Sequence, residues 1–453
     1  MKFTFPKDFM FGVASSAVQI EAASFEDGKG IDVWQHRYTL DPAKYDYHDT
    51  DFGANFYHKY PEDIKLMKEL GITAFRFSIA WTRIYPNGPD KVNQAGIDHY
   101  HKLFDELIKN DIKPLIDLWH CDLPQWVMDR GGLVNPEFID WFVTYAKTCF
   151  KEYGDKIPYW TTVNEPQCNI MAPYAWGIQP PYEKDIKKAN IAGHHMILAH
   201  FKTVKAYREM GYKGKIGIVN HFQLAYGATL DEKDQAAAER DMDFYSYWYT
   251  DAIYAGHYPE SILKYPYMKD NMPENYQKDL DENFVKSDFI GVNYYGAYNV
   301  EYVDNGVLDY KVAPSKVTDS LGFSPNAAGI FDALNEIIKK YPGYELIISE
   351  NGAGGMRKGP YEDSATYEKE LDDEYRITCI REHLRGLSRC LEVGFPVTGY
   401  FHWTLLDTTE GAGGGFSRIF GMVQVRFDKE ERTRVPRKSF YYYKDVIAKA
   451  YVE

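Results

Sequence analysis

Eight short apolar runs, each followed by a longer amphipathic segment, recur along the whole chain. Short, continuously apolar runs are typical of strands buried on both faces, and their alternation with helical segments predicts repeated βα units around a parallel sheet. Eight such units without an intervening linker predict one closed (β/α)8 TIM barrel, an α/β fold, with residues 1–453 as a single domain and elaborated loops at one rim. The expected strands are 9–14, 74–81, 113–120, 159–165, 215–221, 288–295, 345–350 and 397–403.

The segments between these strands predict the helices and the loops. Glycine follows several of the amphipathic segments, as is typical of the carboxyl end of a helix. Two long polar or glycine-rich segments, 296–325 and 407–420, predict loops at the rim formed by the carboxyl ends of the strands. The expected helices are 61–70, 95–110, 136–153, 186–210, 236–255, 327–340 and 373–392.

Two glutamates lie at the carboxyl ends of widely separated expected strands. Glu350 follows an apolar run that Asn351 and Gly352 end, and Glu165 precedes Pro166, which has no N–H for a strand ladder. One such glutamate alone is typical of a surface loop. Two on one rim favour acid/base and nucleophilic chemistry at an acetal carbon, because barrel enzymes collect their catalytic groups there.

Composition excludes several classes of partner. The net charge is −14, from 52 basic and 66 acidic residues, and without a basic patch the chain is not expected to bind nucleic acid. The amino terminus lacks a signal-peptide pattern and no run is long enough to span a membrane, so we expect a cytoplasmic protein. Five scattered cysteines predict neither a disulfide framework nor a zinc site, and no metal or cofactor is expected. A homo-oligomer stays an open alternative.

Further polar and aromatic residues end the expected strands and would converge on the same rim. Each alone is typical of a polar cap or of a ring packed under a loop. A ring of hydrogen-bonding groups around two carboxylates, however, is what recognition of a polyhydroxylated sugar requires, and aromatic rings stack on sugar faces. These residues are Gln19, Arg76, His120, Asn164, Glu165, Asn293, Tyr295, Glu350 and Trp403.

The motifs at these strand ends resemble those of glycoside hydrolase family 1, the β-glucosidase and β-galactosidase family, from about Phe5 to Tyr443. The resemblance implies a retaining β-glycosidase that hydrolyses a terminal β-linked sugar of a small β-glycoside or oligosaccharide by double displacement. The motifs are Gln-Ile-Glu at 19–21, Arg-Phe-Ser at 76–78, His-x-Asp-Leu-Pro at 120–124, Asn-Glu-Pro at 164–166, Asn-Tyr-Tyr at 293–295 and Ser-Glu-Asn-Gly at 349–352.

The resemblance implies that Glu165 is the general acid/base and Glu350 the nucleophile. A retaining mechanism needs carboxyls about 5 Å apart with different pKa values. Arg76 and Tyr295 would stabilise ionised Glu350, with Asn293 also beside it, and the nearby negative charge would keep Glu165 protonated. By resemblance Asn164 holds the sugar 2-hydroxyl, and the substrate-binding residues are Gln19, His120, Asn164, Tyr295, Trp403 and Glu410.

The sequence departs from the family in the expected sugar pocket. Cys121 and Gly411 replace two tryptophans that in relatives line the sugar near its 3-hydroxyl. Either neighbouring loop residues compensate for the lost rings, or the pocket is widened for a modified or branched glycone. Glu410 would repel a phosphate dianion, which disfavours a 6-phospho-β-glucosidase, although Arg418 keeps that alternative open.

Other activities stay open beside hydrolysis. A transglycosidase that passes the sugar to an alcohol or sugar acceptor would use the same glutamates, and the sequence does not determine the natural glycone or aglycone. An inactive carbohydrate-binding relative is disfavoured because both glutamates are retained. A metal-dependent hydrolase is disfavoured because the sequence has no H-E-x-x-H motif, and its one adjacent histidine pair is His194 and His195.

Overall fold

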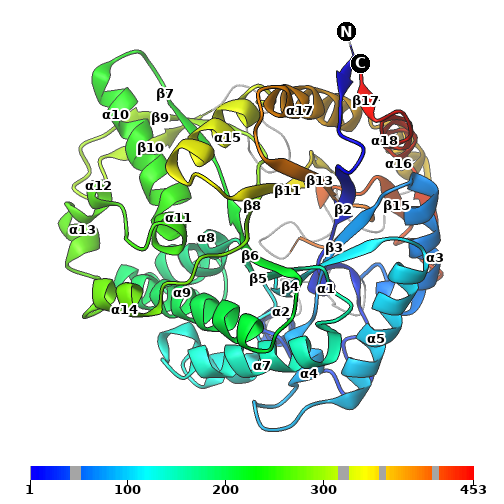
Figure 1. Ribbon diagram of the computed structural model, residues 1–453, viewed down its shortest axis with the longest axis horizontal. Helices are drawn as coiled ribbons and strands as arrows, with labels where there is room; N and C mark the ends of the chain where they lie inside the picture. The colour runs from blue at the N-terminus through cyan, green and yellow to red at the C-terminus, as the bar shows by residue number, and fades with distance from the viewer. Residues whose placement is uncertain (1, 41–52, 315–325, 357–363, 411–417) are drawn as a thin grey trace.

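Eight parallel strands form a closed barrel at the centre of the molecule (Figure 1). The computed structural model describes residues 2–40, 53–314, 326–356, 364–410 and 418–453. Around the barrel the strand order is β11-β13-β2-β3-β4-β5-β6-β8, and β8 pairs with β11 to close the ring. The predicted (β/α)8 barrel is confirmed. Its strands are β2 (Met10–Ala14), β3 (Ala74–Ser78), β4 (Lys113–Trp119), β5 (Tyr159–Asn164), β6 (Lys215–His221), β8 (Phe289–Asn293), β11 (Glu345–Asn351) and β13 (Val397–Trp403).

Most of the long helices surround the barrel and bury one apolar face (Figure 1). In α5, for example, Tyr100, Leu103, Phe104 and Leu107 recur at the three- and four-residue spacing of one helix face, and all four are buried. Burial of this apolar face, more than helix propensity, stabilises such helices. The long helices are α3 (Phe56–Leu70), α5 (Gln94–Lys109), α7 (Phe138–Tyr153), α9 (Ile186–Glu209), α10 (Glu232–Asp241), α11 (Tyr247–Tyr254), α14 (Tyr276–Asn283), α15 (Gly329–Lys340), α17 (Glu374–Glu392) and α18 (Lys438–Lys449).

Shorter elements decorate the connections between strands and helices. The remaining helices are α1 (Ala17–Ile20), α2 (Val33–Leu40), α4 (Trp81–Ile84), α6 (Gln125–Asp129), α8 (Pro166–Ile170), α12 (Glu260–Leu263), α13 (Pro266–Lys269), α16 (Ser364–Lys369) and the 3-10 turn η2 (Gly132–Val134). There are also two π-helical turns, η3 (Met171–Ala175) and η4 (Met242–Ser246). Two short strands pair with each other, β15 (Val423–Val425) and β16 (Arg434–Pro436).

Two helices differ from the sequence prediction. The helix expected from residue 61 begins at Phe56, so Pro61 lies inside it. Phe56 and Tyr57 are buried, and this packing outweighs the hydrogen bond that a proline inside a helix removes. The helix expected over 236–255 is instead divided into α10 and α11 by the π-helical turn η4, which a helical apolar period does not reveal.

The segment 296–325, predicted to be a loop, contains two strands. They are β9 (Ala297–Tyr302) and β10 (Tyr310–Ala313), and with β7 (Leu224–Gly227) they form a three-stranded sheet outside the barrel. Asn299 and Glu301 of β9 and Lys311 of β10 are not buried, so the segment lacks the continuous apolar run from which the barrel strands were predicted. The second expected loop, 407–420, includes residues 411–417 outside the described residues, and it ends in β14 (Arg418–Ile419), which pairs with β12 (Gly355–Met356).

The two ends of the described chain lie side by side (Figure 1). The strand β1 (Phe3–Thr4) pairs antiparallel with β17 (Tyr451–Val452). No disulfide joins the five cysteines, all of which the structure describes. Among the described helices, none is both long enough and apolar enough to cross a membrane.

Candidate active site

Glu350 lies near the carboxyl end of β11 with a donor on each of its oxygens. The pairing of β11 with β8 shifts register between Ile348 and Glu350, and irregularities of this kind re-aim side chains beside active sites. Oε1 accepts a hydrogen bond from Nη1 of Arg76 at 2.5 Å, and Oε2 accepts one from the hydroxyl of Tyr295 at 2.6 Å. Glu350 is buried. This environment suits a carboxylate that carries a full negative charge.

Glu165 follows β5 and begins α8. Its φ is +49°, in the left-handed region that a non-glycine residue seldom adopts, and Pro166 occupies the first helical position after it. The pairing of β5 with β6 also shifts register, between Thr161 and Asn164. Nδ2 of Asn293 donates to Oε1 of Glu165 at 2.7 Å. Both glutamates are therefore placed by local departures from regular strand geometry.

Two asparagines connect the surroundings of the two glutamates. Oδ1 of Asn164 accepts hydrogen bonds from Nη2 of Arg76 at 2.7 Å and from Nδ2 of Asn293 at 3.1 Å. Asn293 lies opposite Glu350 in the strand register and donates to Glu165. The structure thus brings Arg76, Asn164, Asn293 and both glutamates into one hydrogen-bonded group, as expected from the strand ends.

The two carboxyl groups have pKa values displaced in opposite directions. Burial raises the pKa of Glu350, Arg76 opposes this and the charge of Glu165 reinforces it. Burial also acts to raise the pKa of Glu165, but His221 and the donor Asn293 outweigh it and hold that pKa below its usual value. These directions are the reverse of the sequence expectation, in which Glu165 keeps the proton. The reason is His221 of β6, which the sequence expectation did not include.

His120 and Trp403 form a stacked pair on the same rim. Their ring centroids are 5.4 Å apart and their planes differ by 10°. Nδ1 of His120 lies 3.3 Å from Oδ2 of Asp117, and Nε2 lies 3.2 Å from Nδ2 of Asn164. The asparagine amide donates, so Nε2 accepts and Nδ1 carries the proton. The ring of His120 is thereby fixed beside Asn164.

Gln19 and Glu410 come together from opposite ends of the chain. Nε2 of Gln19 donates to Oε1 of Glu410 at 3.2 Å and to the carbonyl oxygen of Thr409 at 3.0 Å. Burial raises the pKa of Glu410 to about 7, against the hydroxyl of Thr408 and the charge of Arg418. Gly411, the second position that departs from the family, lies outside the described residues.

Cys121 stands where the sequence comparison expects one of the two lost tryptophans. Its φ is +68°, and its carbonyl accepts a hydrogen bond from Nε1 of Trp34 at 2.7 Å. Burial and the charges of nearby carboxylates, among them Glu165 and Glu350, raise the pKa of its thiol. A cavity of about 20 Å³ lies beside Cys121 and Trp34. That volume is room for about one water, much less than an indole ring.

Four residues of this candidate site were not predicted from the sequence, namely Asp117, His221, Tyr245 and Cys168. Asp117 of β4 pairs with Arg76, its Oδ2 lying 2.6 Å from Nη2, and it is fully buried. The sequence did contain a sign of this role, because Asp117 is a charged residue inside an otherwise apolar expected strand. His221 ends β6 at the rim, where Nδ1 lies 3.0 Å from the hydroxyl of Tyr245. Cys168 hydrogen-bonds the side chains of Glu165 and Tyr245, and no spacing pattern pointed to it.

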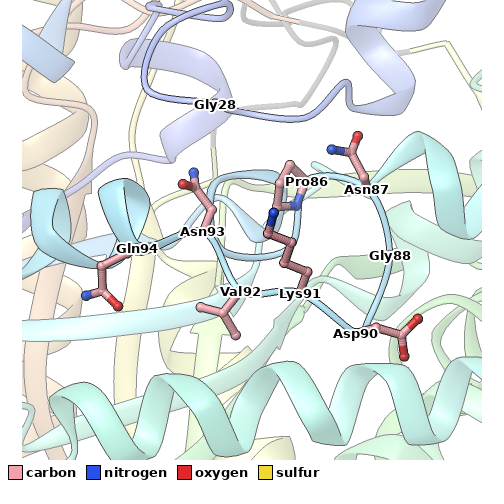
Figure 2. A pocket seen from close by; sticks show the side chains of 9 residues that line it. All are labelled: Gly28, Pro86, Asn87, Gly88, Asp90, Lys91, Val92, Asn93 and Gln94. Carbon is pink, nitrogen blue, oxygen red and sulfur yellow. The ribbon is translucent and has the colours of Figure 1, made fainter.

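A separate groove lies beside the connection between α4 and α5 (Figure 2). It has a volume of about 570 Å³ and is lined by Gly28 and by residues 86–88 and 90–94. The side chains of Asn87, Asn93 and Gln94 supply amides, and Asp90 and Lys91 supply one charge of each sign (Figure 2). None of the nine lining residues is aromatic and none adds a second carboxylate. The groove therefore lacks the pair of carboxylates and the aromatic rings that lie at the barrel rim.

The closed barrel and the glutamate pair on its carboxyl rim define the chain as a (β/α)8-barrel glycoside hydrolase. The sequence model of Glycosyl hydrolase family 1 matches residues 1–451, and the chain belongs to that family.

Curated relatives match almost the whole chain. It is 37% identical over 454 residues to beta-glucosidase A of Acetivibrio thermocellus, covering 98% of both sequences. It is 33% identical over 464 residues to a 6-phospho-beta-glucosidase of Bacillus subtilis, again covering 98% of both. Among solved structures, a family 1 β-glucosidase from Thermotoga maritima superposes with a TM-score of 0.93 at 32% identity, covering 100% of this chain and 99% of that one. The family, the fold and the enzyme class predicted from the sequence are confirmed.

Proposed function

We propose that the protein is a retaining β-glycosidase, β-glucosidase-like, with Glu350 as the nucleophile and Glu165 as the general acid/base. The observation that carries this assignment is the difference between their partners. Glu350 receives a cationic donor from Arg76 and a hydroxyl from Tyr295, which an attacking carboxylate needs. Glu165 receives two neutral donors, the amide of Asn293 and the thiol of Cys168, and leaves capacity for a proton.

In the first step Glu350 attacks the anomeric carbon while Glu165 gives its proton to the departing oxygen, and a glycosyl ester forms on Glu350. In the second step Glu165 takes a proton from water, the water attacks the anomeric carbon and the ester breaks. The sugar keeps its β configuration because two inversions follow each other. We assign Asn164, whose side chain is held by Arg76 and Asn293, to the 2-hydroxyl of the sugar.

The reactive site carries one proton, on Glu165. A proton on Glu350 would sit on an oxygen that already accepts from Arg76 or from Tyr295, whereas protonated Glu165 can donate to the glycosidic oxygen of a bound substrate. In the protein without substrate, His221 lowers the pKa of Glu165 and burial raises the pKa of Glu350. We infer that substrate binding reverses this order and places the proton on Glu165.

The identity of the sugar that the site accepts, the glycone, is a second part of the proposal. The β-glucosidase relatives support a glucose-like ring, with Gln19 and Glu410 receiving its hydroxyls. A 6-phosphorylated sugar would bring a dianion toward the carboxyl of Glu410, which ionises above a pKa of about 7. Because Cys121 removes an indole from the 3-hydroxyl side, we propose tolerance of a substituent or branch there. The cavity of about 20 Å³ beside Cys121 adds little space by itself, so this widening depends on the segment that contains Gly411.

The aglycone would lie on the side of Glu165, where Trp176 is 41% exposed. The ring planes of Trp176 and Tyr245 are parallel to within 1°, with centroids 6.4 Å apart. The exposed ring of Trp176, supported by the parallel ring of Tyr245, suits an aryl or sugar aglycone that stacks on it. A sugar held there could also act as acceptor, so transglycosylation is the second candidate function. The whole chain, 1–453, would act as one domain in either reaction.

Azide rescue tests the two roles separately. Glu350→Ala should abolish hydrolysis, and azide should restore turnover and give the α-glycosyl azide, because azide attacks from the vacated side. Glu165→Ala should still form the glycosyl-enzyme from substrates with activated leaving groups, and azide should then give the β product. Wild-type hydrolysis by either variant would contradict the assignment.

A further inference from the structure

Glu165, Cys168 and His221 bring an oxygen, a sulfur and a nitrogen ligand to one side of the active site. Their ligand atoms all lie within 4.8 Å of one another. Cys168 lies in α8, where its backbone N–H donates to the carbonyl of Glu165 at 3.0 Å, and His221 ends the strand β6 that pairs with β5. Glu165 and Cys168 are only partly buried, so the group is open to solvent and to ions.

These three ligand types suit a borderline-soft divalent cation. Zinc binds thiolate, imidazole and carboxylate, and sites that are open for exchange use three protein ligands and leave a fourth position for water. Tetrahedral zinc, with bonds of about 2.3 Å to sulfur and about 2.0–2.2 Å to nitrogen and oxygen, places its ligand atoms roughly 3.5 Å apart. Atoms already within 4.8 Å reach that spacing by small side-chain rotations.

Contacts outside the three ligands already fix their orientation. The hydroxyl of Tyr245 lies 3.0 Å from Nδ1 of His221 and also hydrogen-bonds the side chain of Cys168. A hydrogen bond on one ring nitrogen commonly sets the tautomer and ring orientation of a metal-ligating histidine. The carboxylate of Glu165 is likewise oriented by a hydrogen bond, which its Oε1 accepts from Nδ2 of Asn293. The ligand set is therefore positioned before an ion arrives.

We propose that Glu165, Cys168 and His221 form an inhibitory site for a borderline-soft divalent cation such as Zn²⁺. The ion binds Nε2 of His221, a carboxylate oxygen of Glu165 and Sγ of Cys168, and the thiol proton passes to solvent as the metal–sulfur bond forms. Glu165 then holds the metal in place of a proton and does not protonate the leaving oxygen. The inhibition rests on the acid/base role proposed above, whereas the binding does not. Mg²⁺, which prefers oxygen ligands, binds weakly.

Titration with Co²⁺ tests the binding independently of activity. In metal-free wild-type enzyme, Co²⁺ should produce a thiolate-to-cobalt charge-transfer band, and Zn²⁺ should displace it and inhibit hydrolysis until a chelator is added. Cys168→Ala should abolish the band, and Cys168→Ala and His221→Asn should each weaken zinc inhibition by at least about tenfold. Cys379→Ser is the matched control, because Cys379 lies in α17 and should leave band and inhibition unchanged.

The results separate this inference from the proposed function. Absence of the band in the wild type, or equal zinc inhibition in Cys168→Ala, overturns the metal site. Azide rescue of Glu165→Ala together with such a result leaves the glycosidase assignment intact. A cobalt band in an enzyme that hydrolyses at its full rate overturns the inhibitory role and also counts against Glu165 as the acid/base.

Discussion

Arg76 and Glu350 form a buried ion pair in which Nη1 and Oε1 are 2.5 Å apart. The same guanidinium also pairs with Asp117, so one cation is shared between two carboxylates. A buried ion pair is weak evidence for stability, because desolvation of the charges offsets their attraction. In the mechanism proposed above its role is functional, since it keeps a negatively charged oxygen in an enclosed site at the end of β11. Tyr295 completes the arrangement from the other oxygen.

Removal of the Tyr295 hydroxyl should weaken the nucleophile. The hydroxyl donates to Oε2 of Glu350 at 2.6 Å and lowers the pKa of that carboxyl. In Tyr295→Phe the pKa of Glu350 rises, so the acidic limb of the kcat/KM profile should move to higher pH. A hydrogen bond to a charged group contributes about 1.5–3 kcal/mol, so kcat should fall about 10- to 100-fold.

The matched control for this experiment is Tyr294→Phe. Tyr294 is the adjacent tyrosine, and its hydroxyl donates to the carbonyl of Asn326, outside the glutamate pair. The Tyr294→Phe variant should therefore have the same acidic limb in its kcat/KM profile as the wild type. Equal displacement of the limb in both variants would show that loss of a buried hydroxyl, and not loss of the contact to Glu350, caused it.

His221 should control the basic limb of the same profile. The active form carries one proton on the glutamate pair, so the profile is a bell whose limbs belong to the pair as a whole. The charge of His221 lowers the pKa of Glu165, so His221→Asn should raise that pKa and move the basic limb to higher pH. Glu165→Gln, assayed with an activated aryl leaving group, should have no basic limb. A limb that stays in Glu165→Gln would assign the acid to another residue.

Glu410 should make sugar binding depend on pH near neutrality. Its pKa is raised to about 7, so the carboxyl is neutral below that pH and ionised above it. An ionised carboxylate accepts stronger hydrogen bonds from sugar hydroxyls, so KM should fall as pH rises through about 7. Glu410→Gln should show a higher KM without this step. Glu345→Gln, which changes a carboxyl at the opposite end of the barrel, should keep the step.

Restoring the family's indoles should change which glycone is preferred. Cys121→Trp combined with Gly411→Trp returns two rings and two N–H donors to the 3-hydroxyl side. Each recovered neutral hydrogen bond contributes about 0.5–1.5 kcal/mol, so kcat/KM for an aryl β-glucoside should rise relative to that for its 3-O-substituted analogue. If the wild type already prefers the plain glucoside and the double variant leaves the ratio unchanged, neighbouring residues have replaced the rings and the pocket is not widened.

The positions of Glu165 and Glu350 could be predicted because each ends an apolar run, and parallel strands of a closed barrel end on one rim. Their protonation could not be predicted, because it depends on His221, which reaches Glu165 from the neighbouring strand. The strands β9 and β10 were missed for a different reason. Their sheet lies outside the barrel, so half of its residues are polar and the segment resembles a loop.

The left-handed backbone of Glu165 sets a limit on protein engineering. A non-glycine residue held there costs on the order of 1–3 kcal/mol, which the rest of the fold must offset. Glycine removes both this cost and a carboxylate that lies close to the charge of Glu350. A mutant library screened for heat resistance alone would therefore enrich inactive clones at this position. Directed evolution of a thermostable form needs an activity selection in every round.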